Sequence, residues 1–113
     1  MRRKVFGLIS IFMLIGLLSG AVEANSVIYN YNQSKSSQSN ATAFTSSSNI
    51  NESIGLVITS YAWLGSTMQT RTGGDYTNGI ASVFTYHSSG YTVSRILSVH
   101  NYAGVQKTLD RNY

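Results

Sequence analysis

The residues that could perform acid–base chemistry are few in this chain. It has two histidines, His87 and His100, and beyond position 24 its acidic residues are Glu52, Asp75 and Asp110. A serine hydrolase needs a serine nucleophile activated by a histidine base, and no serine here stands in a G-x-S-x-G turn. The three acids occur singly in separate segments, which does not favour hydrolysis by paired carboxylates. We therefore expect a protein that is not an enzyme.

The same residues offer little to a metal ion or cofactor. A zinc site draws three or four ligands from Cys, His, Asp and Glu side chains. The chain has no cysteine, and its two histidines lie thirteen residues apart at the ends of expected strands. The sequence therefore predicts neither a metal site nor a cofactor.

Aromatic residues are the stronger candidates for a binding role. All eight tyrosines and the single tryptophan lie after residue 25. Flat aromatic rings give a large contact area at low entropic cost, as on surfaces that bind sugars or proteins. The candidate binding residues are Trp63, Tyr76, Tyr86 and Tyr91, with Tyr61 and Tyr102 as further members of such a platform. For Trp63 a central core position is the favoured alternative, whereas Tyr76 lies in a loop flanked by glycines and is expected to be exposed.

The first 24 residues have the organisation of a secretory signal peptide. The basic block Arg2-Arg3-Lys4 precedes an uncharged apolar run, Val5–Leu18, and small residues follow. We expect cleavage after Ala24, with cleavage after Ala21 as the second choice. An uncleaved membrane anchor is disfavoured because this run has 14 residues, whereas a spanning helix needs roughly 20. A lipid anchor is excluded because position 21 is not cysteine.

Cleavage at this position leaves 89 residues, enough for one small domain. Five basic and three acidic side chains remain, so the formal charge is +2, and no cluster of Lys or Arg is present to bind nucleic acid. Without disulfides, the domain must be stabilised by packing, by a partner or by self-association. Cysteine avoidance in an exported chain is typical of bacteria. The expected partner is a cell-envelope component, a glycan or another protein.

Composition also favours β-structure. Ser, Thr and Asn provide 35 of these 89 residues, and their side chains compete with the helical backbone for hydrogen bonds. Residues 25–53 are polar and are expected to form either a flexible leader or a pair of exposed edge strands. Residues 54–113 are expected to form the β-rich core of the single domain.

Alternating or apolar segments separated by turn signals predict the individual strands. The expected strands are 26–32, 41–45, 54–64, 66–72, 80–87, 91–100 and 104–109. Residues 73–79 are expected to be a turn-rich connection, because Asn78-Gly79 is favoured in tight hairpin turns. Residues 88–90 are expected to form a short hairpin loop. The sequence thus predicts an all-β fold after the signal-peptide helix, a small antiparallel sandwich first and a small barrel second.

Two functions remain open from the sequence. The first is a secreted, non-enzymatic module that binds a partner at the cell exterior. The second is a bacteriocin-like antagonistic protein that acts on the envelope of competing cells, which export, small size and mild positive charge would suit. Three Asn-X-Ser/Thr sequons, at Asn32, Asn40 and Asn51, would accept glycans in a eukaryotic secretory pathway, but such patterns arise easily by chance in this composition.

Overall fold

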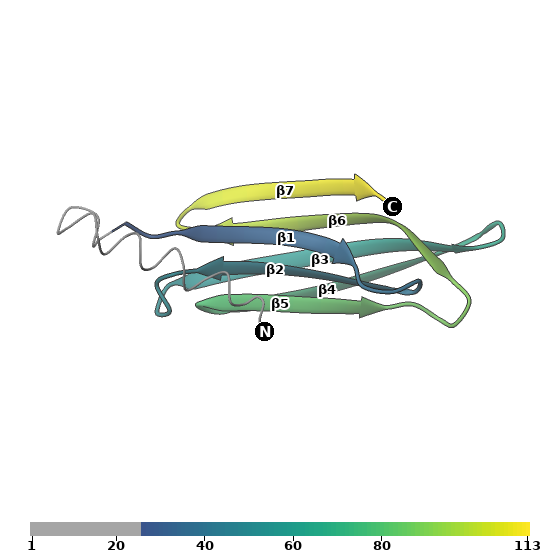
Figure 1. Ribbon diagram of the computed structural model, residues 1–113, viewed down its shortest axis with the longest axis horizontal. Helices are drawn as coiled ribbons and strands as arrows, with labels where there is room; N and C mark the ends of the chain where they lie inside the picture. The colour runs from purple at the N-terminus through teal and green to yellow at the C-terminus, as the bar shows by residue number, and fades with distance from the viewer. Residues whose placement is uncertain (1–25) are drawn as a thin grey trace.

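Residues 26–113 are described by a computed structural model and form two antiparallel β-sheets packed face to face (Figure 1). The strands are β1 (Tyr29–Lys35), β2 (Asn40–Ser47), β3 (Ser53–Leu64), β4 (Thr67–Asn78), β5 (Ile80–Tyr86), β6 (Thr92–Tyr102) and β7 (Val105–Asn112). The described residues contain no helix that could cross a membrane. This small all-β sandwich confirms the predicted fold class, while the signal-peptide prediction concerns residues outside the described part.

The two sheets differ in size. The smaller sheet has the strand order β1-β2-β5, and the larger sheet has the order β4-β3-β6-β7. Strands β1, β3, β5 and β7 all end at the same end of the sandwich, where the β3–β4 hairpin reaches furthest (Figure 1). We call this the hairpin end. We call the other end of the sandwich the opposite end.

The alternation of β5 shows how the sequence forms a half-buried strand. Successive side chains point to opposite faces of a sheet, and along β5 exposed and buried residues alternate without a break. Ala81, Val83 and Thr85 face the other sheet, whereas Phe84 and Tyr86 face outward with 52% and 62% exposure. β5 therefore carries both part of the core and part of the outer surface.

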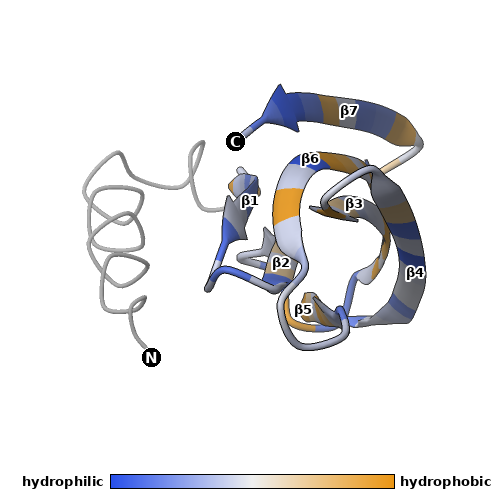
Figure 2. Ribbon diagram, turned by 90° about the vertical axis from the view of Figure 1, so that its right-hand side faces the viewer, coloured by the Kyte–Doolittle hydropathy of each residue, from blue (hydrophilic) through white to orange (hydrophobic). Residues whose placement is uncertain are grey.

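Many of the residues in the core between the sheets are small. The buried hydrophobic residues are Ala41, Ala43, Ile54, Leu56, Ile58, Ala62, Ala81, Val83, Val93 and Ile96. Viewed end-on, the larger sheet curves around the smaller one, and β4 comes close to β5 (Figure 2). A Cβ added at Gly73 of β4 would lie 2.8 Å from Cγ1 of Val83 on β5. Glycine at position 73 thus allows the two sheets to approach at this side.

The polar N-terminal part contributes to the core, unlike a flexible leader. β1 is an edge strand, but β2 is the middle strand of the smaller sheet, and it buries Ala41, Ala43 and Thr45. The expectation that this region is a flexible leader or a pair of edge strands is therefore wrong for β2. This strand is difficult to recognise as a central strand from the sequence, because its inward side chains are small or carry hydroxyl groups and its inner face is apolar only in part.

Two of the predicted turns are also wrong. Residues 73–77 belong to β4, which pairs with β3 along its whole length. The segment at Asn78-Gly79 crosses from the larger sheet to the smaller one, and the segment at 88–90 crosses back to the larger sheet, so neither closes a hairpin. Gly79 is nevertheless required, because its φ is 84° and its amide donates a hydrogen bond to the carbonyl oxygen of Glu52 at 3.0 Å. Turn residues identify the bend but not the sheet that the next strand joins.

Candidate functional site

Both histidines lie inside the sandwich, each hydrogen-bonded to a serine. The Nε2 atom of His87, which follows β5, lies 2.7 Å from the hydroxyl of Ser60 on β3. That hydroxyl lies 2.6 Å from the hydroxyl of Thr85. The His87 Nδ1 atom lies 3.1 Å from Oε1 of Gln69. Burial, and secondarily the charge of Arg71, lowers the pKa of His87.

His100 takes part in a second buried network. Its Nε2 atom lies 2.8 Å from the Ser98 hydroxyl, and its Nδ1 atom lies 2.8 Å from the Thr45 hydroxyl. The Gln33 amide donates to the same Ser98 oxygen at 2.8 Å, and the Tyr113 hydroxyl donates to Gln33 Oε1 at 2.8 Å. Burial lowers the pKa of His100 to about 4, with a partial offset from a hydrogen bond to the Phe44 backbone. The ring is therefore neutral at neutral pH.

These pairs have the distances of a nucleophile and its base, but their position opposes catalysis. Ser60, Ser98 and His100 have no exposed surface, and His87 is 8% exposed. A substrate could reach either serine only if the two sheets separated. Within residues 26–113, no three His or acidic side chains come together as metal ligands. The two networks instead give hydrogen-bond partners to buried polar groups of both sheets. Burial of these groups without partners would reduce the stability of the fold.

The four aromatic residues named as binding candidates occupy different places. Tyr76 is 78% exposed on the outer face of the larger sheet, at the opposite end from the hairpin. Tyr86 is 62% exposed on the outer face of the smaller sheet. Tyr91 is partly buried and packs against the core. The structure therefore does not combine these residues into one aromatic platform.

Trp63 is not a core residue, contrary to the favoured expectation. It is 43% exposed, near the end of β3, and it pairs across the hairpin with Met68. The reason is its parity along the strand: Ala62 faces the core, so its neighbour must face outward. Trp63 shares its face with Tyr76, but the positions differ by eight residues along β3, roughly 26 Å at 3.3 Å per residue.

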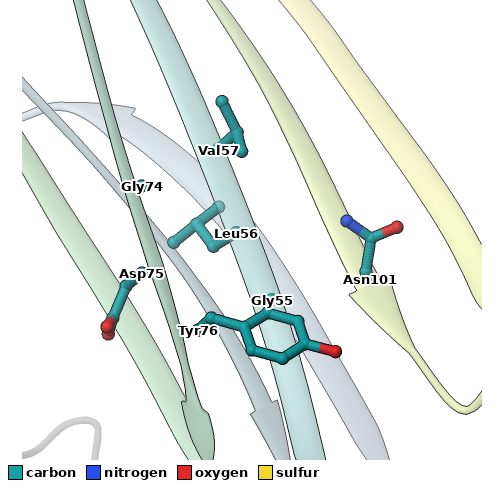
Figure 3. A pocket seen from close by; sticks show the side chains of 7 residues that line it. All are labelled: Gly55, Leu56, Val57, Gly74, Asp75, Tyr76 and Asn101. Atoms are coloured by element: carbon teal, nitrogen blue, oxygen red, sulfur yellow. The ribbon is translucent and has the colours of Figure 1, made fainter.

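The surroundings of Tyr76 form the best-defined surface site. Gly55 of β3 pairs with Tyr76 of β4 on one side and with Asn101 of β6 on the other. The tyrosine ring lies against Gly55, since a Cβ at that position would lie 2.7 Å from Tyr76 Cδ1. Asn101 stands across from the ring (Figure 3). We call the depression that these three residues form the Tyr76 notch.

Two open depressions meet at the notch. One, of about 340 Å³, extends along β3 and β4 toward Val57 and Gly74. The other, of about 390 Å³, extends toward the β6–β7 turn and reaches Gln106. Tyr76 and Asn101 line both. Each volume is at the lower limit of small-molecule sites, so together they form a shallow groove rather than an enclosed pocket.

The polar groups of the notch are free to bind a ligand. Within the described residues, neither the Tyr76 hydroxyl nor the Asn101 side-chain amide has a hydrogen-bond partner. The one charged group nearby, Asp75, points away from the ring (Figure 3), and its Oδ2 accepts a hydrogen bond from the Ser82 amide at 3.2 Å. The groove thus presents an aromatic ring, a hydroxyl and an amide without a directed charge.

Sequence reasoning identified Tyr76 but missed Asn101 and Gly55. Nothing in a single sequence links the three, because they lie on different strands and meet only through the register of β3 with its two neighbours. A glycine inside the apolar segment 54–64 is the one available signal, since glycine within a strand often marks a close approach of another group.

Arg71 and Arg95 both lie on strands of the larger sheet. Arg71 is exposed on the edge strand β4. Arg95 forms a bidentate pair with Asp110, with N–O distances of 2.9 and 2.8 Å, and its guanidinium lies 5.0 Å from the centre of the Tyr61 ring.

Comparisons of the chain with protein-family models, with curated proteins and with solved structures find no match.

Proposed function

We propose that this protein is a secreted, non-enzymatic binding module whose ligand occupies the Tyr76 notch. The observation that carries the proposal is the position of two side chains on either side of Gly55. The Tyr76 ring is 78% exposed, and the Asn101 amide, which has no hydrogen-bond partner among the described residues, lies across from it. The exposed ring rests on one side against Gly55, and this contact would lower the cost of ordering the ring on binding.

The chemistry of the notch fits an uncharged ligand rich in hydroxyl groups. The Cδ1–Cε1 side of the Tyr76 ring lies against Gly55, and the remaining exposed ring surface can pack against the C–H face of a sugar. The Asn101 amide offers both donors and an acceptor for neighbouring hydroxyls. Asp75 is turned toward β5, so it contributes little to this surface. The proposed ligand is accordingly a glycan of a cell envelope or an extracellular matrix.

The non-enzymatic part of the proposal draws support from the interior. The two Ser–His contacts involve serines without exposed surface, and a nucleophile must reach its substrate at about hydrogen-bond distance. An opening of the sandwich large enough to admit a substrate would break both buried networks. The groups that could do hydrolytic chemistry therefore serve the fold.

The test is retention of the protein on purified cell-wall polysaccharide or immobilised glycans. We expect saturable binding that falls roughly tenfold in Tyr76→Ala, as for an aromatic hot spot. Asn101→Ala should weaken it as well. Tyr86→Ala is the matched control, because Tyr86 is also exposed in a strand but lies on the other sheet.

Two controls separate binding from folding. Tyr76→Phe keeps the ring over Gly55 and removes only the hydroxyl, so it should retain most of the binding if stacking dominates. Circular dichroism and thermal melting of each variant establish that the sandwich is intact. Equal retention of the wild type and Tyr76→Ala on every glycan that binds the wild type would contradict the proposal.

The antagonistic function is the second candidate, and one observation favours it. Apolar residues are exposed at the hairpin end, where basic side chains also gather, a combination suited to an envelope surface. A purified antagonist should inhibit some indicator strain at micromolar concentration. If a broad bacterial panel grows unaffected, this second function is wrong.

A further inference from the structure

Three apolar side chains are exposed together at the tip of the β3–β4 hairpin. Trp63, Leu64 and Met68 are 43%, 49% and 49% exposed. Leu64 pairs with Thr67, so only Gly65 and Ser66 form the turn between the strands. We call Trp63, Leu64 and Met68 the hairpin tip.

The tip has a defined shape and extends past its neighbours. Gly65 has a φ of 61°, which suits a two-residue hairpin turn with glycine in its first position. Trp63 is the last residue of β3 paired with β6, so the turn lies beyond that strand. Figure 1 shows the hairpin as the furthest point of the sandwich at this end. Insertion with the turn foremost would bring Trp63 and Met68, on the outer face, and Leu64, which lies beside Gly90 on the other face, to the same interface.

Charge is distributed unequally along the sandwich. Lys35 ends β1 at the hairpin end, and Arg71 lies three residues after Met68 on β4. Arg111, next to last in β7, also lies toward this end and binds the Asn32 side chain at 3.0 Å. These three cations have no acidic partner among the described residues.

Two of the three acidic side chains among the described residues lie elsewhere. Glu52 directly precedes β3 and Asp75 lies near the end of β4, both toward the opposite end. The third, Asp110, precedes Arg111 on β7 toward the hairpin end, but it is paired with Arg95. The hairpin end therefore presents apolar side chains with an excess of positive charge behind them.

We propose that the hairpin tip inserts into the interface of an anionic lipid bilayer. Tryptophan is enriched at the interfaces of membranes because its ring is apolar and its N–H is polar. Leu64 and Met68 would gain by leaving water, and Lys35 and Arg71 would face the lipid phosphates. A soluble polyanion would use the cations but leave the three apolar side chains without a partner, which is why a bilayer is the favoured occupant.

This site is independent of the proposed function. The Tyr76 notch lies at the other end of the larger sheet, and the interaction there is with an uncharged ligand. Tip variants should change lipid binding and leave glycan retention unaltered, while Tyr76→Ala should have the reverse effect. The failure of one proposal can thus be distinguished from the failure of the other.

The experiment uses the fluorescence of Trp63, the only tryptophan in the chain. Its emission reports the tip and no other segment. With vesicles that contain phosphatidylglycerol, we expect a shift to shorter wavelength, reduced quenching by acrylamide and quenching by brominated lipid. Vesicles of phosphatidylcholine alone should give a weaker response. Unchanged Trp63 emission at saturating anionic lipid would overturn the proposal.

Variants test the two contributions separately. Leu64→Asn combined with Met68→Thr should lower the partition coefficient roughly tenfold, and Arg71→Gln should lower it roughly fivefold. Ile80→Asn is the matched apolar control, because Ile80 is 56% exposed at the opposite end. Lys107→Gln is the corresponding charge control, near the start of β7.

Two results in these variants would also count against insertion. If the double tip variant binds anionic vesicles as well as Ile80→Asn does, the apolar tip is not the inserted part. If a soluble polyphosphate binds as tightly as the vesicles and Trp63 emission stays constant in both, the site is an electrostatic surface and not a membrane anchor.

Discussion

The imidazole of His100 and the hydroxyl of Ser98 are hydrogen-bonded at 2.8 Å in the interior of the sandwich. The two residues lie two positions apart on β6, so both face the smaller sheet. Thr45 and Gln33 of that sheet continue the chain of hydrogen bonds. The two sheets are therefore joined by a polar network as well as by apolar packing.

This network makes the stability of the protein sensitive to mild acid. His100 has an ordinary pKa of 6.5 when unfolded and a pKa of about 4 in the fold, so the unfolded chain binds the proton more tightly. Proton binding by His100 therefore favours the unfolded state. This destabilisation is absent above pH 6.5 and grows as the pH falls toward 4. Urea unfolding should give a free energy lower by roughly 2–3 kcal/mol at pH 4.5 than at pH 7.

The control for this prediction is His100→Gln, measured over the same pH range. The variant is expected to be less stable at pH 7, but its stability should vary less with pH. His87, whose pKa is also lowered, would account for the remaining slope. Identical slopes in the wild type and the variant would show that His100 is not the responsible group.

Ser60 is predicted to be important for stability because its hydroxyl joins Thr85 and His87. Ser60→Ala leaves both partners buried without this contact and should cost about 1–3 kcal/mol. Adding Thr85→Val removes one orphaned hydroxyl, so the double variant should lose less than the sum of the two single losses. Chemical denaturation of the four proteins in this cycle measures the coupling, and strict additivity would argue against the network.

Tyr29 is predicted to anchor the N-terminal strand through Glu52. Its hydroxyl lies 2.7 Å from both carboxylate oxygens, and this hydrogen bond, with burial, raises the pKa of Tyr29 to about 12. The stabilisation is complete below pH 10 and is lost as the pH rises toward 12. Tyr29→Phe should cost about 1–2 kcal/mol at pH 7.

Absorbance titration provides the direct measurement for Tyr29. The difference between the titration curves of the wild type and Tyr29→Phe reports the ionisation of Tyr29 alone, and it should have its midpoint near pH 12. If the difference spectrum instead titrates near pH 10, the hydrogen bond to Glu52 is not maintained in solution.

Gly73 is predicted to tolerate no side chain. A Cβ there would lie 2.8 Å from Val83 Cγ1, and Val83 is buried between the sheets. Gly73→Ala should therefore destabilise the protein by about 1–3 kcal/mol. In a thermal-melting cycle, combination with Val83→Ala should relieve part of this loss, whereas additive losses would mean that the contact is loose.

The strand pattern was largely predictable, and the errors have a common physical cause. The segment 54–64 is apolar and β-branched, and it forms β3 almost as expected. The segment 73–77 was misread because two adjacent glycines are typical of turns, yet here Gly73 serves the close approach of β4 to β5. Similarly, β2 contains few large apolar residues and escaped recognition as a central strand.

Of the residues that form the Tyr76 notch, only Tyr76 itself could be predicted from the sequence. The glycines that precede Tyr76 suggested exposure, and its ring is indeed the most exposed of the large hydrophobic side chains described. Trp63 was misplaced because a lone tryptophan is a common core residue, whereas here the neighbouring Ala62 occupies the core side. Successive residues of a strand face opposite sides of the sheet, so a shift of one residue moves a side chain from the core to the solvent. A single sequence does not determine which residues face the core near a hairpin turn.

Composition and local pattern determined that this chain is an all-β domain, because Ser, Thr, Asn and Tyr oppose helices and alternation favours strands. Only the tertiary structure decided which strands share a sheet, and so brought Tyr76 and Asn101 together across Gly55. It also placed both histidines inside the sandwich and Trp63 outside it. Local preferences act over a few residues, whereas sheet register depends on contacts between segments far apart in the chain.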